Sequence, residues 1–374
     1  MNILQIGLSS YPGGVENAIL NYYRFMDKGK VQFDFVCTEE TLAYSEEIER
    51  AGGKIFYLPS PKRNMLRYRK ALRKVINEGK YETVHVNMLS AINLFPAVFA
   101  KGTCAKRIIA HAHNANLPGR VKRAAHRLLK CWVRVFANEY LACSKEAAIW
   151  LFGKKGAEKT RIVKNAIDYN KYRYSEEVRQ EMRARYGIPE TGKVIGHVGR
   201  FGEEKNQKFL VDRFARVLKL RPETYLMLIG DGGLQQTVKQ QVEDLHIADR
   251  VIFVSGVNNT APFYQMMDIF CLPSLFEGLG IAAIEAQIAG LPCICSTGVP
   301  QATVITQKAK RVGLKNGDSW VSVILAMLEQ NRAPAEETEI AGIGYSAADE
   351  AVKLQEYYLK GTVYETSQSA NYQS

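Results

Sequence analysis

The sequence lacks the features that mark secreted and membrane-spanning proteins. No uninterrupted run approaches the ~18 apolar residues that a membrane-spanning helix needs, and no charged and apolar leader with a small-residue cleavage site is present. Its seven cysteines, an odd number spread from Cys37 to Cys295, do not suit a disulfide framework. The neighbours Cys293 and Cys295 have no histidine or second cysteine pair nearby in sequence, which favours packing in a strand. We therefore expect a cytoplasmic protein with free thiols.

The sequence also lacks the pattern that chelates a metal-bound diphosphate. No Asp-x-Asp follows a predicted strand, and Phe33-Asp34-Phe35 supplies one carboxylate. His111 and His113 follow a predicted strand and point the same way, but a zinc site would need a third ligand that the sequence does not identify. We expect no metal and no cofactor.

Negative charge is scarce in the first half of the chain. The formal net charge is +12, and residues 1–175 hold 30 Lys and Arg against 14 Asp and Glu, whereas residues 176–374 hold 20 against 24. The two halves therefore meet different partners, and the first prefers something anionic, such as phosphates, nucleic acid or a membrane surface.

Residues 118–137 show the clearest helical period of the basic half. One face is apolar, made of Val121, Ala125, Leu128, Leu129, Trp132 and Phe136. The opposite face is basic, made of Arg123, Arg127, Lys130 and Arg134. A second basic segment covers residues 62–74. Residues 118–137 are either a packed helix with a solvated charged face or a helix that docks on an anionic membrane leaflet. Nucleic acid is disfavoured, because no aromatic residues interleave with the charges.

Two α/β domains are expected from the length of 374 residues, the 47% apolar content and the alternation of short apolar runs with helical stretches. The predicted strands are Ile3–Leu8, Phe33–Cys37, Ile55–Leu58, Thr83–Val86, Arg107–Ala110, Tyr140–Ala142, Arg161–Val163, Val194–Val198, Tyr225–Ile229, Val251–Val254, Ile269–Leu272 and Cys293–Cys295. The predicted boundaries are a first domain over 1–167, a linker over 168–190, a second domain over 191–344, a helix over 345–360 that crosses back to the first domain, and a disordered polar tail over 361–374. Both domains are predicted to be doubly wound, with ligands beyond the carboxyl ends of their strands in a central cleft.

A pair of glutamates frames the start of one helix in the second half. Glu277 precedes a Gly-rich turn, Gly278-Leu279-Gly280, and Glu285 lies inside the apolar helix that follows. A spacing of eight residues is a little over two helical turns, so both carboxylates can face one crevice at different depths. Free backbone N–H groups at the turn favour anions or polar oxygens. A buried Glu285 needs a partner. The alternative is a solvated face.

Two further turns stand between a strand and a helix. Arg200 and Lys205 flank one of them, where a guanidinium fork and an ammonium could together bind a diphosphate leaving group. Gly13 and Gly14 form the other, where backbone N–H groups could approach a phosphate. An exposed basic loop and a plain turn are the respective alternatives.

Five motifs together resemble the retaining glycosyltransferases of family 4, which have the GT-B fold of two Rossmann-like domains. They run in family order along nearly the whole chain: Gly13-Gly14-Val15-Glu16, Gly199-Arg200 with Glu204-Lys205-Asn206, Ile229-Gly230-Asp231-Gly232, Pro273-Ser274, and Glu277-x7-Glu285 with Ala289-Gly290-Leu291-Pro292. The sequence around both glutamates looks most like that of transferases of capsular and exopolysaccharide assembly.

The resemblance implies a role for each matching residue. Arg200 and Lys205 would bind the donor diphosphate, and Glu285 the ribose hydroxyls. Glu277 and His113 would both contact the transferred sugar. The other implied donor contacts are Gly13, Gly14, Asn258, Gly278, Leu279 and Gly280. The acceptor side would hold Glu16, Asn87 and His111.

We therefore expect transfer of a hexosyl unit from a nucleotide diphosphate sugar to an acceptor hydroxyl, with retained configuration and no metal. UDP is preferred because it is the commonest donor in the resembled group, and a lipid-linked saccharide at the inner leaflet suits the basic first domain. The alternatives are a sugar-nucleotide epimerase, which would act without an acceptor, and a non-catalytic partner that binds a nucleotide sugar. A phosphorylase of the familiar kind would need a pyridoxal phosphate lysine, for which no motif is present.

Overall fold

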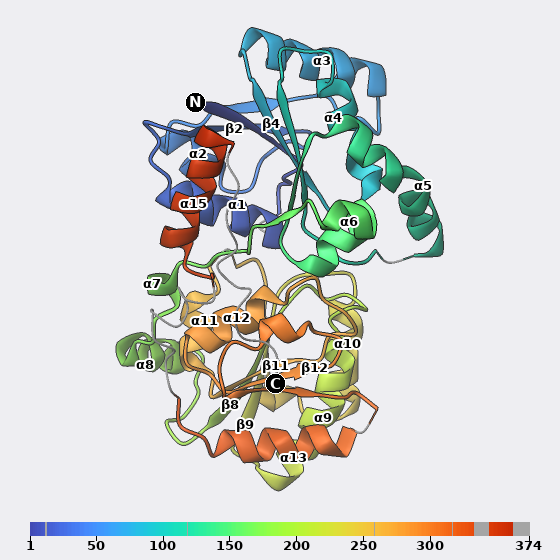
Figure 1. Ribbon diagram of the computed structural model, residues 1–374. Coiled ribbons are helices and arrows are strands. Elements are labelled where there is room, and N and C mark those ends of the chain that lie inside the picture. The colour runs from blue at the N-terminus through green and yellow to red at the C-terminus, as the bar shows by residue number, and fades with distance from the viewer. Residues whose placement is uncertain (12, 118, 258, 316, 333–343, 362–374) are drawn as a thin grey trace, which may run out of the picture. The chain divides into compact units, whose positions relative to one another are not determined.

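The computed structural model describes the chain except residues 12, 118, 258, 316, 333–343 and 362–374 (Figure 1). It divides into two compact units, and the first is discontinuous in sequence. Unit 1 comprises Met1–Ile167 and the segment from Gly344 onward, and unit 2 comprises Asp168–Ile343. The residues predicted as a tail lie outside the described part from residue 362. Among the described helices, none combines the length and apolarity that crossing a bilayer requires.

Unit 1 is a parallel sheet with helices on both faces. Its elements are β1 (Asn2–Ile6), α1 (Gly14–Phe25), β2 (Gln32–Cys37), α2 (Ser45–Arg50), β3 (Ile55–Tyr57), α3 (Met65–Glu78), β4 (Thr83–Met88), η1 (Ala91–Leu94), α4 (Phe95–Ala100), β5 (Arg107–Ala112), α5 (Arg120–Phe136), β6 (Glu139–Ala142), α6 (Lys145–Ala157), β7 (Arg161–Ile162) and α15 (Ala347–Lys360). Within the described residues the strand order is β3-β2-β1-β4-β5-β6-β7. The order reverses between β1 and β4, which is the doubly wound arrangement.

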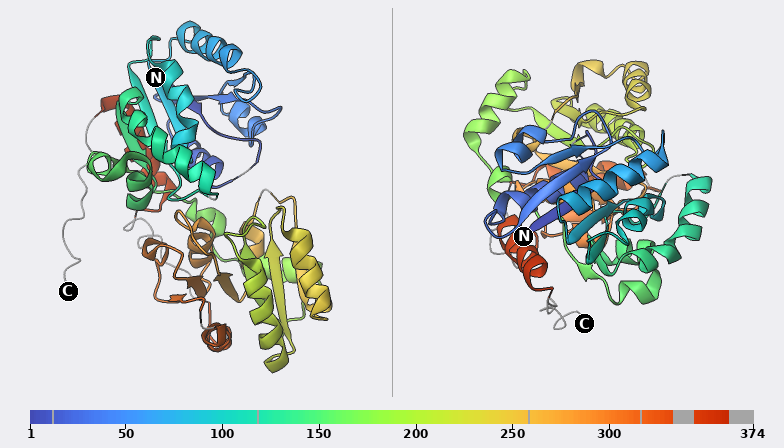
Figure 2. Two further views of the ribbon diagram at one scale, coloured as in Figure 1. Left: turned by 90° about the vertical axis from the view of Figure 1, so that its right-hand side faces the viewer. Right: turned by 90° about the horizontal axis from the view of Figure 1, so that it is seen from above.

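The strands of unit 1 are nearly continuous apolar runs because helices cover both faces. On one face α3, α4 and α6 pack against a core that includes Leu72, Ala97 and Phe152. On the other, α1 and α15 lie side by side over a second core that includes Phe33 and Tyr358 (Figures 1 and 2). The C-terminal helix is thus a structural layer of the first unit.

Unit 2 repeats the plan with a shorter sheet. Its elements are α7 (Tyr169–Tyr172), α8 (Glu176–Arg185), β8 (Lys193–Val198), α9 (Gln207–Leu220), β9 (Thr224–Ile229), α10 (Gln235–Asp244), η2 (Ala248–Arg250), β10 (Val251–Val254), α11 (Ala261–Met266), β11 (Ile269–Leu272), α12 (Ile281–Ile288), β12 (Cys293–Ser296), η3 (Gln301–Thr303), β13 (Ala309–Val312) and α13 (Gly317–Leu328). The parallel order among the described strands is β10-β9-β8-β11-β12-β13, and α9, α10 and α13 pack on one face around Phe214 and Trp320.

The chain passes between the units at two places that are joined to each other. Ile167 pairs with Ser346 in a short parallel bridge. The N–H of Ile167 donates to the Tyr345 carbonyl at 2.8 Å, and the N–H of Ala347 donates to the Ile167 carbonyl at 3.1 Å. The outgoing and returning segments therefore leave unit 1 from one point.

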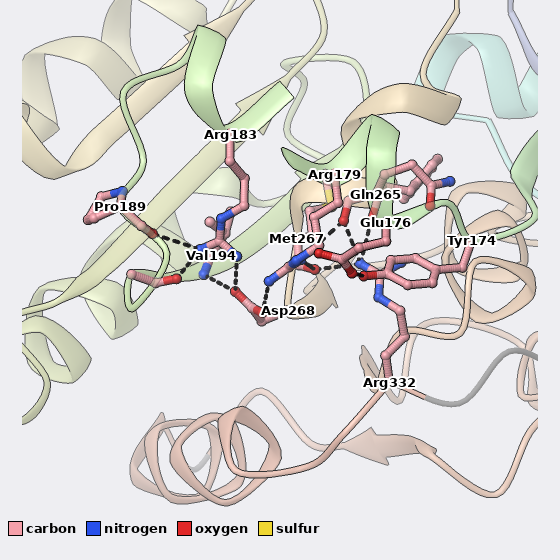
Figure 3. A network of polar contacts seen from close by, with 12 residues as sticks. Tyr174, Glu176, Arg179, Arg183, Pro189, Val194, Gln265, Met267, Asp268 and Arg332 are labelled. Atoms are coloured by element: carbon pink, nitrogen blue, oxygen red, sulfur yellow. Dashed lines mark hydrogen bonds and ion pairs between the residues drawn. The ribbon is translucent and has the colours of Figure 1, made fainter. Parts of the chain in front are cut away.

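The segment predicted as a linker, residues 168–190, is a packed part of unit 2. Figure 3 shows the arginines of α8 aimed at Asp268, which precedes β11. Arg179 Nη2 lies 2.7 Å from Asp268 Oδ1, and the other oxygen of Asp268 accepts the N–H of Val194 at 2.7 Å. From the opposite side, Arg332 lies over the ring of Tyr174 at 4.3 Å. A mostly buried ion pair of this kind fixes α8 to the sheet, so the linker prediction was wrong.

Each strand predicted from the sequence overlaps a strand of the structure, and one strand of the described residues was missed. This strand, β13, consists of Ala309, Lys310, Arg311 and Val312 at the edge of the sheet, where two charged side chains in four residues obscure the apolar signal. The predicted packing of Cys293 and Cys295 is confirmed, since both are buried in β12 as free thiols.

Candidate functional site

The candidate site of unit 2 lies at the carboxyl ends of β8 and β11, where two loops are joined. The Leu275 N–H donates to the Glu204 carbonyl at 2.8 Å, and Asn206 Nδ2 donates to the Pro273 carbonyl at 3.2 Å. These bonds hold the loop that carries Lys205 against the loop that carries Glu277. Two motifs some seventy residues apart in sequence thus form one rigid structure.

Lys205 and Glu277 form an ion pair that is largely shielded from solvent. Lys205 Nζ lies 2.6 Å from Glu277 Oε1, and their side chains are 19% and 11% exposed. Ser274 Oγ donates to the same oxygen at 2.6 Å. In the described part of the chain no donor to Glu277 Oε2 is present. A lysine ammonium has three donors, so the pair keeps both an acceptor and donors for a ligand.

Arg200 and Gly199 stand beside Lys205 at the end of β8. Arg200 is exposed, while its carbonyl accepts a hydrogen bond from Gln207 Nε2 at 2.9 Å. A Cβ at Gly199 would lie 3.2 Å from Lys205 Cδ and 3.2 Å from His197 Nε2. Glycine at this position therefore lets the lysine side chain cross the backbone toward Glu277.

His197 lies buried next to Lys205 and is held neutral. Its Nδ1 is 2.9 Å from the Cys271 carbonyl, which can only accept, so the proton is on Nδ1 and Nε2 is unprotonated. Burial lowers the pKa of His197 to about 4, and the charge of Lys205 adds to this effect. A neutral imidazole does not repel the lysine ammonium at neutral pH.

The Gly-rich turn ends at the start of α12. Gly280 is the N-cap with φ of +74°, a left-handed conformation that favours glycine. Gly278 and Leu279 precede it, and the Leu279 carbonyl accepts from Thr303 Oγ1. The helix begins at Ile281, so the predicted first-turn positions at 278 to 280 lie just before it.

Glu285 is buried in α12 with a partner on each oxygen. Oε1 accepts from the hydroxyl of Tyr172 and Oε2 from that of Tyr264, both at 2.8 Å. Burial raises the pKa of the Glu285 carboxyl, and the two tyrosine hydrogen bonds partly oppose this. The predicted need for a partner is met by phenols rather than by a cation. A ligand hydroxyl would use the second lone pair of an oxygen or displace a tyrosine.

In unit 1 the glycine loop is organised around Glu16. Its Oε1 accepts from the N–H and the hydroxyl of Ser9, both at 2.8 Å, and its Oε2 accepts from the Gly13 N–H at 3.2 Å. Gly13 is the N-cap of α1, and Gly14 is its first residue. Both oxygens of the buried Glu16 therefore hold the loop closed, and a contact with an acceptor stays a prediction. The Gly13 N–H is likewise donated within the loop.

The other unit 1 residues come together on one face of the sheet. β5 continues past the predicted end at Ala110, so His111 lies inside the strand and His113 directly follows it. The two rings are 4.0 Å apart, and His113 Nε2 is 2.8 Å from Asn87 Oδ1. Burial lowers the pKa of His113 to about 3 and that of His111 well below its ordinary value. Asn258, the remaining predicted residue, lies outside the described residues.

Comparison with known proteins identifies the family. The model of Glycosyl transferases group 1 matches residues 178–341, and that of Glycosyltransferase Family 4 matches residues 12–171. EpsF of Bacillus subtilis (strain 168), which is named as a glycosyltransferase, is 32% identical over 300 residues, covering 77% of both chains. The chain belongs to this glycosyltransferase family. This confirms the family predicted from the five motifs.

Further similarities support the fold of the glycosyltransferase. The chain is 22% identical over 318 residues, or 79% of both chains, to the UDP-Gal:alpha-D-GlcNAc-diphosphoundecaprenol alpha-1,3-galactosyltransferase of Escherichia coli. The solved structure of Anabaena Alr3699/HepE in complex with UDP-glucose is 19% identical, with a TM-score of 0.77 over 97% of this chain and all of that one. The GT-B fold predicted from the sequence is confirmed as two parallel-sheet α/β units.

The sequence did not predict several side chains of the candidate site. Ser274 belongs to one of the five motifs, but its position in the sequence does not reveal the hydrogen bond that it donates to Glu277. Tyr172 and Tyr264 are 113 and 21 residues away from Glu285 in sequence. The available signal was indirect, since a carboxylate in an apolar helix demands donors without naming them.

The helix α5 is packed over one part of its predicted apolar face and open over the other. Leu129 and Phe136 are partly buried against the unit 1 core. Val121, Leu128 and Trp132 of the same face are 83%, 73% and 51% exposed. Part of the apolar face is therefore open, and no acidic residue lies within the helix. An exposed apolar stripe on a basic helix needs an explanation beyond core packing.

Proposed function

We propose that this glycosyltransferase moves a hexosyl unit from a UDP-sugar to a hydroxyl of a lipid-linked saccharide, with retained configuration and without a metal ion or cofactor. The observation that carries the proposal is the 2.6 Å pair of Lys205 and Glu277 at the carboxyl edge of the unit 2 sheet. It sets a cation for a leaving diphosphate beside a carboxylate for a sugar hydroxyl.

The chemistry follows from the charges at this edge. When the bond to the donor phosphate breaks, negative charge grows on the leaving oxygen, and the Lys205 ammonium with the exposed Arg200 guanidinium would stabilise it. The free Oε2 of Glu277 would accept a hydrogen bond from the sugar. We propose a same-face route in which the leaving phosphate takes the acceptor proton.

Donor binding would divide among the remaining residues. Glu285 would hold the ribose hydroxyls, and the backbone at Gly278, Leu279 and Gly280 would face the sugar. In unit 1, His113 would also contact the transferred group, and Asn87 and His111 would lie toward the acceptor. Support for a UDP-sugar comes from the UDP-glucose complex of HepE, and support for a lipid-linked acceptor comes from the name of the E. coli relative.

The acceptor class fits a peripheral position on the inner membrane face. The exposed apolar residues of α5 stand among Arg120, Lys122, Arg127 and Arg134, which are also exposed. An amphipathic helix of this composition buries its apolar side chains at the headgroup boundary, and each basic residue near anionic lipid contributes about 1 kcal/mol. The proposed occupant of this surface is anionic lipid.

The test is a donor panel with and without acceptor. The purified protein is incubated with UDP-, GDP- and ADP-hexoses, alone and with saccharides linked to undecaprenyl diphosphate, in the presence of EDTA. We expect acceptor-dependent release of one nucleotide and an α-linked product from an α-linked donor. Conversion of the donor without acceptor would instead establish an epimerase. Donor binding without any turnover across the panel would favour the non-catalytic partner.

A further inference from the structure

A column of buried polar side chains runs through unit 1, between its sheet and the C-terminal helix. Gln5 of β1, His85 and Asn87 of β4 and His111 of β5 share one face of the sheet, because Gln5 pairs with His85 and Asn87 pairs with His111 in the strand register. Tyr358 of α15 covers the column. Its hydroxyl lies 2.6 Å from His85 Nδ1.

The direction of each hydrogen bond in the column can be assigned from one backbone carbonyl. Asn87 Nδ2 lies 3.2 Å from the Ile6 carbonyl, which only accepts, so this atom is the amide nitrogen and Oδ1 faces His113. His113 Nε2 must then carry a proton, which it donates to Asn87. Burial lowers the pKa of His113 to about 3, so the ring is neutral and its Nδ1 is an acceptor.

The same reasoning continues through Gln5 to the other end. Asn87 Nδ2 also donates to Gln5 Oε1 at 3.0 Å, so Gln5 Nε2 faces the Tyr358 hydroxyl at 3.4 Å. Tyr358 accepts from Gln5, and among the described residues His85 Nδ1 is the one acceptor within reach of its hydroxyl, so its own proton is directed there. Burial raises the pKa of Tyr358, which keeps that proton in place.

The direction of the hydrogen bond between His85 and His111 follows from this assignment. Burial lowers the pKa of His85 to about 3, so the neutral ring carries its proton on Nε2 and donates it to His111 Nδ1 at 3.1 Å. His111 is neutral too and must be protonated on Nε2. The Nε2 of His111 and the Nδ1 of His113 are both buried, and neither has a partner in the part of the chain that the structure describes.

We propose that Tyr358, Gln5 and Asn87 are positioning residues that fix the histidine tautomers, so that His111 offers a hydrogen-bond donor beside an acceptor on His113. The two rings are 4.0 Å apart. Hydroxyl groups both donate and accept, so a neutral polyhydroxylated ligand satisfies both atoms. Sulfate and carboxylate carry no proton at neutral pH and cannot donate to His113, and an ammonium cannot accept from His111. A ligand that leaves either buried atom unpaired is therefore disfavoured, which is the basis of the selection.

The first test reads the tautomers directly by ¹⁵N NMR on ligand-free protein labelled at its six histidines. At neutral pH we expect His85, His111 and His113 to be protonated on Nε2, and His197 on Nδ1 as the internal contrast. Assignment uses single His→Gln variants. A different tautomer or a doubly protonated ring at any of the three positions overturns the proposal.

The second test removes one hydroxyl. Tyr358→Phe should give mixed tautomers at His85 and His111 while His113, held by Asn87, is unchanged. Tyr357→Phe is the matched control, because the Tyr357 hydroxyl donates to Glu139 outside the column. Unchanged His85 and His111 signals in a folded Tyr358→Phe protein overturn the proposal. If that variant does not fold, Asn87→Ala must release the tautomer of His113, and a fixed signal there has the same meaning.

The ligand class is tested with glycerol and sodium sulfate at equal concentration, because sulfate accepts hydrogen bonds but has no proton to donate. Glycerol should move the ¹⁵N signals of His111 and His113 and leave those of the exposed His246, whereas sulfate should move neither of the pair. A response to sulfate, or no response to glycerol, overturns the assignment of a hydroxylated ligand. No turnover is measured in these experiments, so the proposed reaction can fail while the tautomer assignment stands.

Discussion

At the scale of single residues, the charged side chains of the site were predictable, and their partners were not. Lys205 and Glu277 stand out because each follows a strand and precedes a helix start. That they meet at 2.6 Å depends on the β8–β11 pairing, which a periodic pattern does not specify. Glu16 is a second example, since the resemblance implied an acceptor contact but did not reveal that both its oxygens accept hydrogen bonds from the glycine loop.

Replacing Lys205 tests the site most directly. Lys205→Ala should lower kcat by about 10²-fold or more, because a fixed charge on the leaving group acts mainly in the transition state. The KM for the donor should change far less. Lys208→Ala, an exposed lysine three residues on, is the control and should retain activity. Steady-state kinetics over a donor series give both constants, and equal activity of the Lys205 variant would contradict the assignment.

The buried Glu285 predicts a dependence of stability on pH. Since its folded pKa is raised, the folded protein holds a proton that the unfolded chain has released between the ordinary carboxyl range and the raised value. The associated stability is fully present below the unfolded pKa and is lost as pH rises through the folded one. Glu285→Gln cannot ionise. Its Tm should therefore rise relative to wild type as the pH increases from about 4 to 7.

Calorimetry at several pH values checks this expectation. Glu203→Gln provides the control, because Glu203 is exposed and its neutralisation removes no burial effect. A difference in Tm between wild type and Glu285→Gln that stays constant with pH would show that the tyrosine hydrogen bonds fully compensate for burial.

At the scale of elements, apolar runs located the strands of both sheets because those strands are buried on two faces. The edge strand β13 escaped, since Lys310 and Arg311 reach solvent there. The helix α5 was found by its period, but the face it buries was not. The amphipathic pattern of a helix shows on which face the apolar residues lie. It does not show whether that face contacts protein, lipid or water.

The exposed stripe of α5 predicts binding to anionic vesicles at low salt. The double variant Leu128→Glu and Trp132→Glu should no longer float with liposomes that contain phosphatidylglycerol, because it places charge where apolar side chains enter the lipid. Leu220→Glu, a 62% exposed leucine of unit 2, is the matched control and should float like wild type. Wild-type protein that stays with the aqueous fraction would remove the membrane from the proposal.

At the scale of the whole molecule, the division into two units could be predicted from the chain length and from the alternation of apolar runs with helical stretches. Which segments belong to which unit could not. Residues 168–190 read as a polar connector because arginines and glutamates dominate them. In the structure Arg179 and Arg183 pair with Asp268 and fix α8 to unit 2. Composition describes which side chains are polar, and only the tertiary partners decide whether they are solvated.

The discontinuity of unit 1 predicts unequal behaviour of the fragments. Residues 168–343 contain every described element of unit 2 and should fold alone. Residues 1–167 lack α15, whose Ala351, Leu354 and Tyr358 are buried in the unit 1 core, and should show no cooperative melting. Adding a peptide of residues 344–361 to the 1–167 fragment should restore a transition. Circular dichroism melts compare the fragments, and a cooperative transition of 1–167 alone would contradict the role given to α15.

The bridge between Ile167 and Ser346 has a consequence for synthesis on the ribosome. Because the last described helix completes the first unit, one sheet face of the N-terminal half is covered only in part until residue 360 has emerged, while the later unit can already fold. A chain that terminates early therefore leaves a finished second unit attached to an unfinished first one. Such a product exposes the apolar surface that α15 would cover and is open to proteolysis.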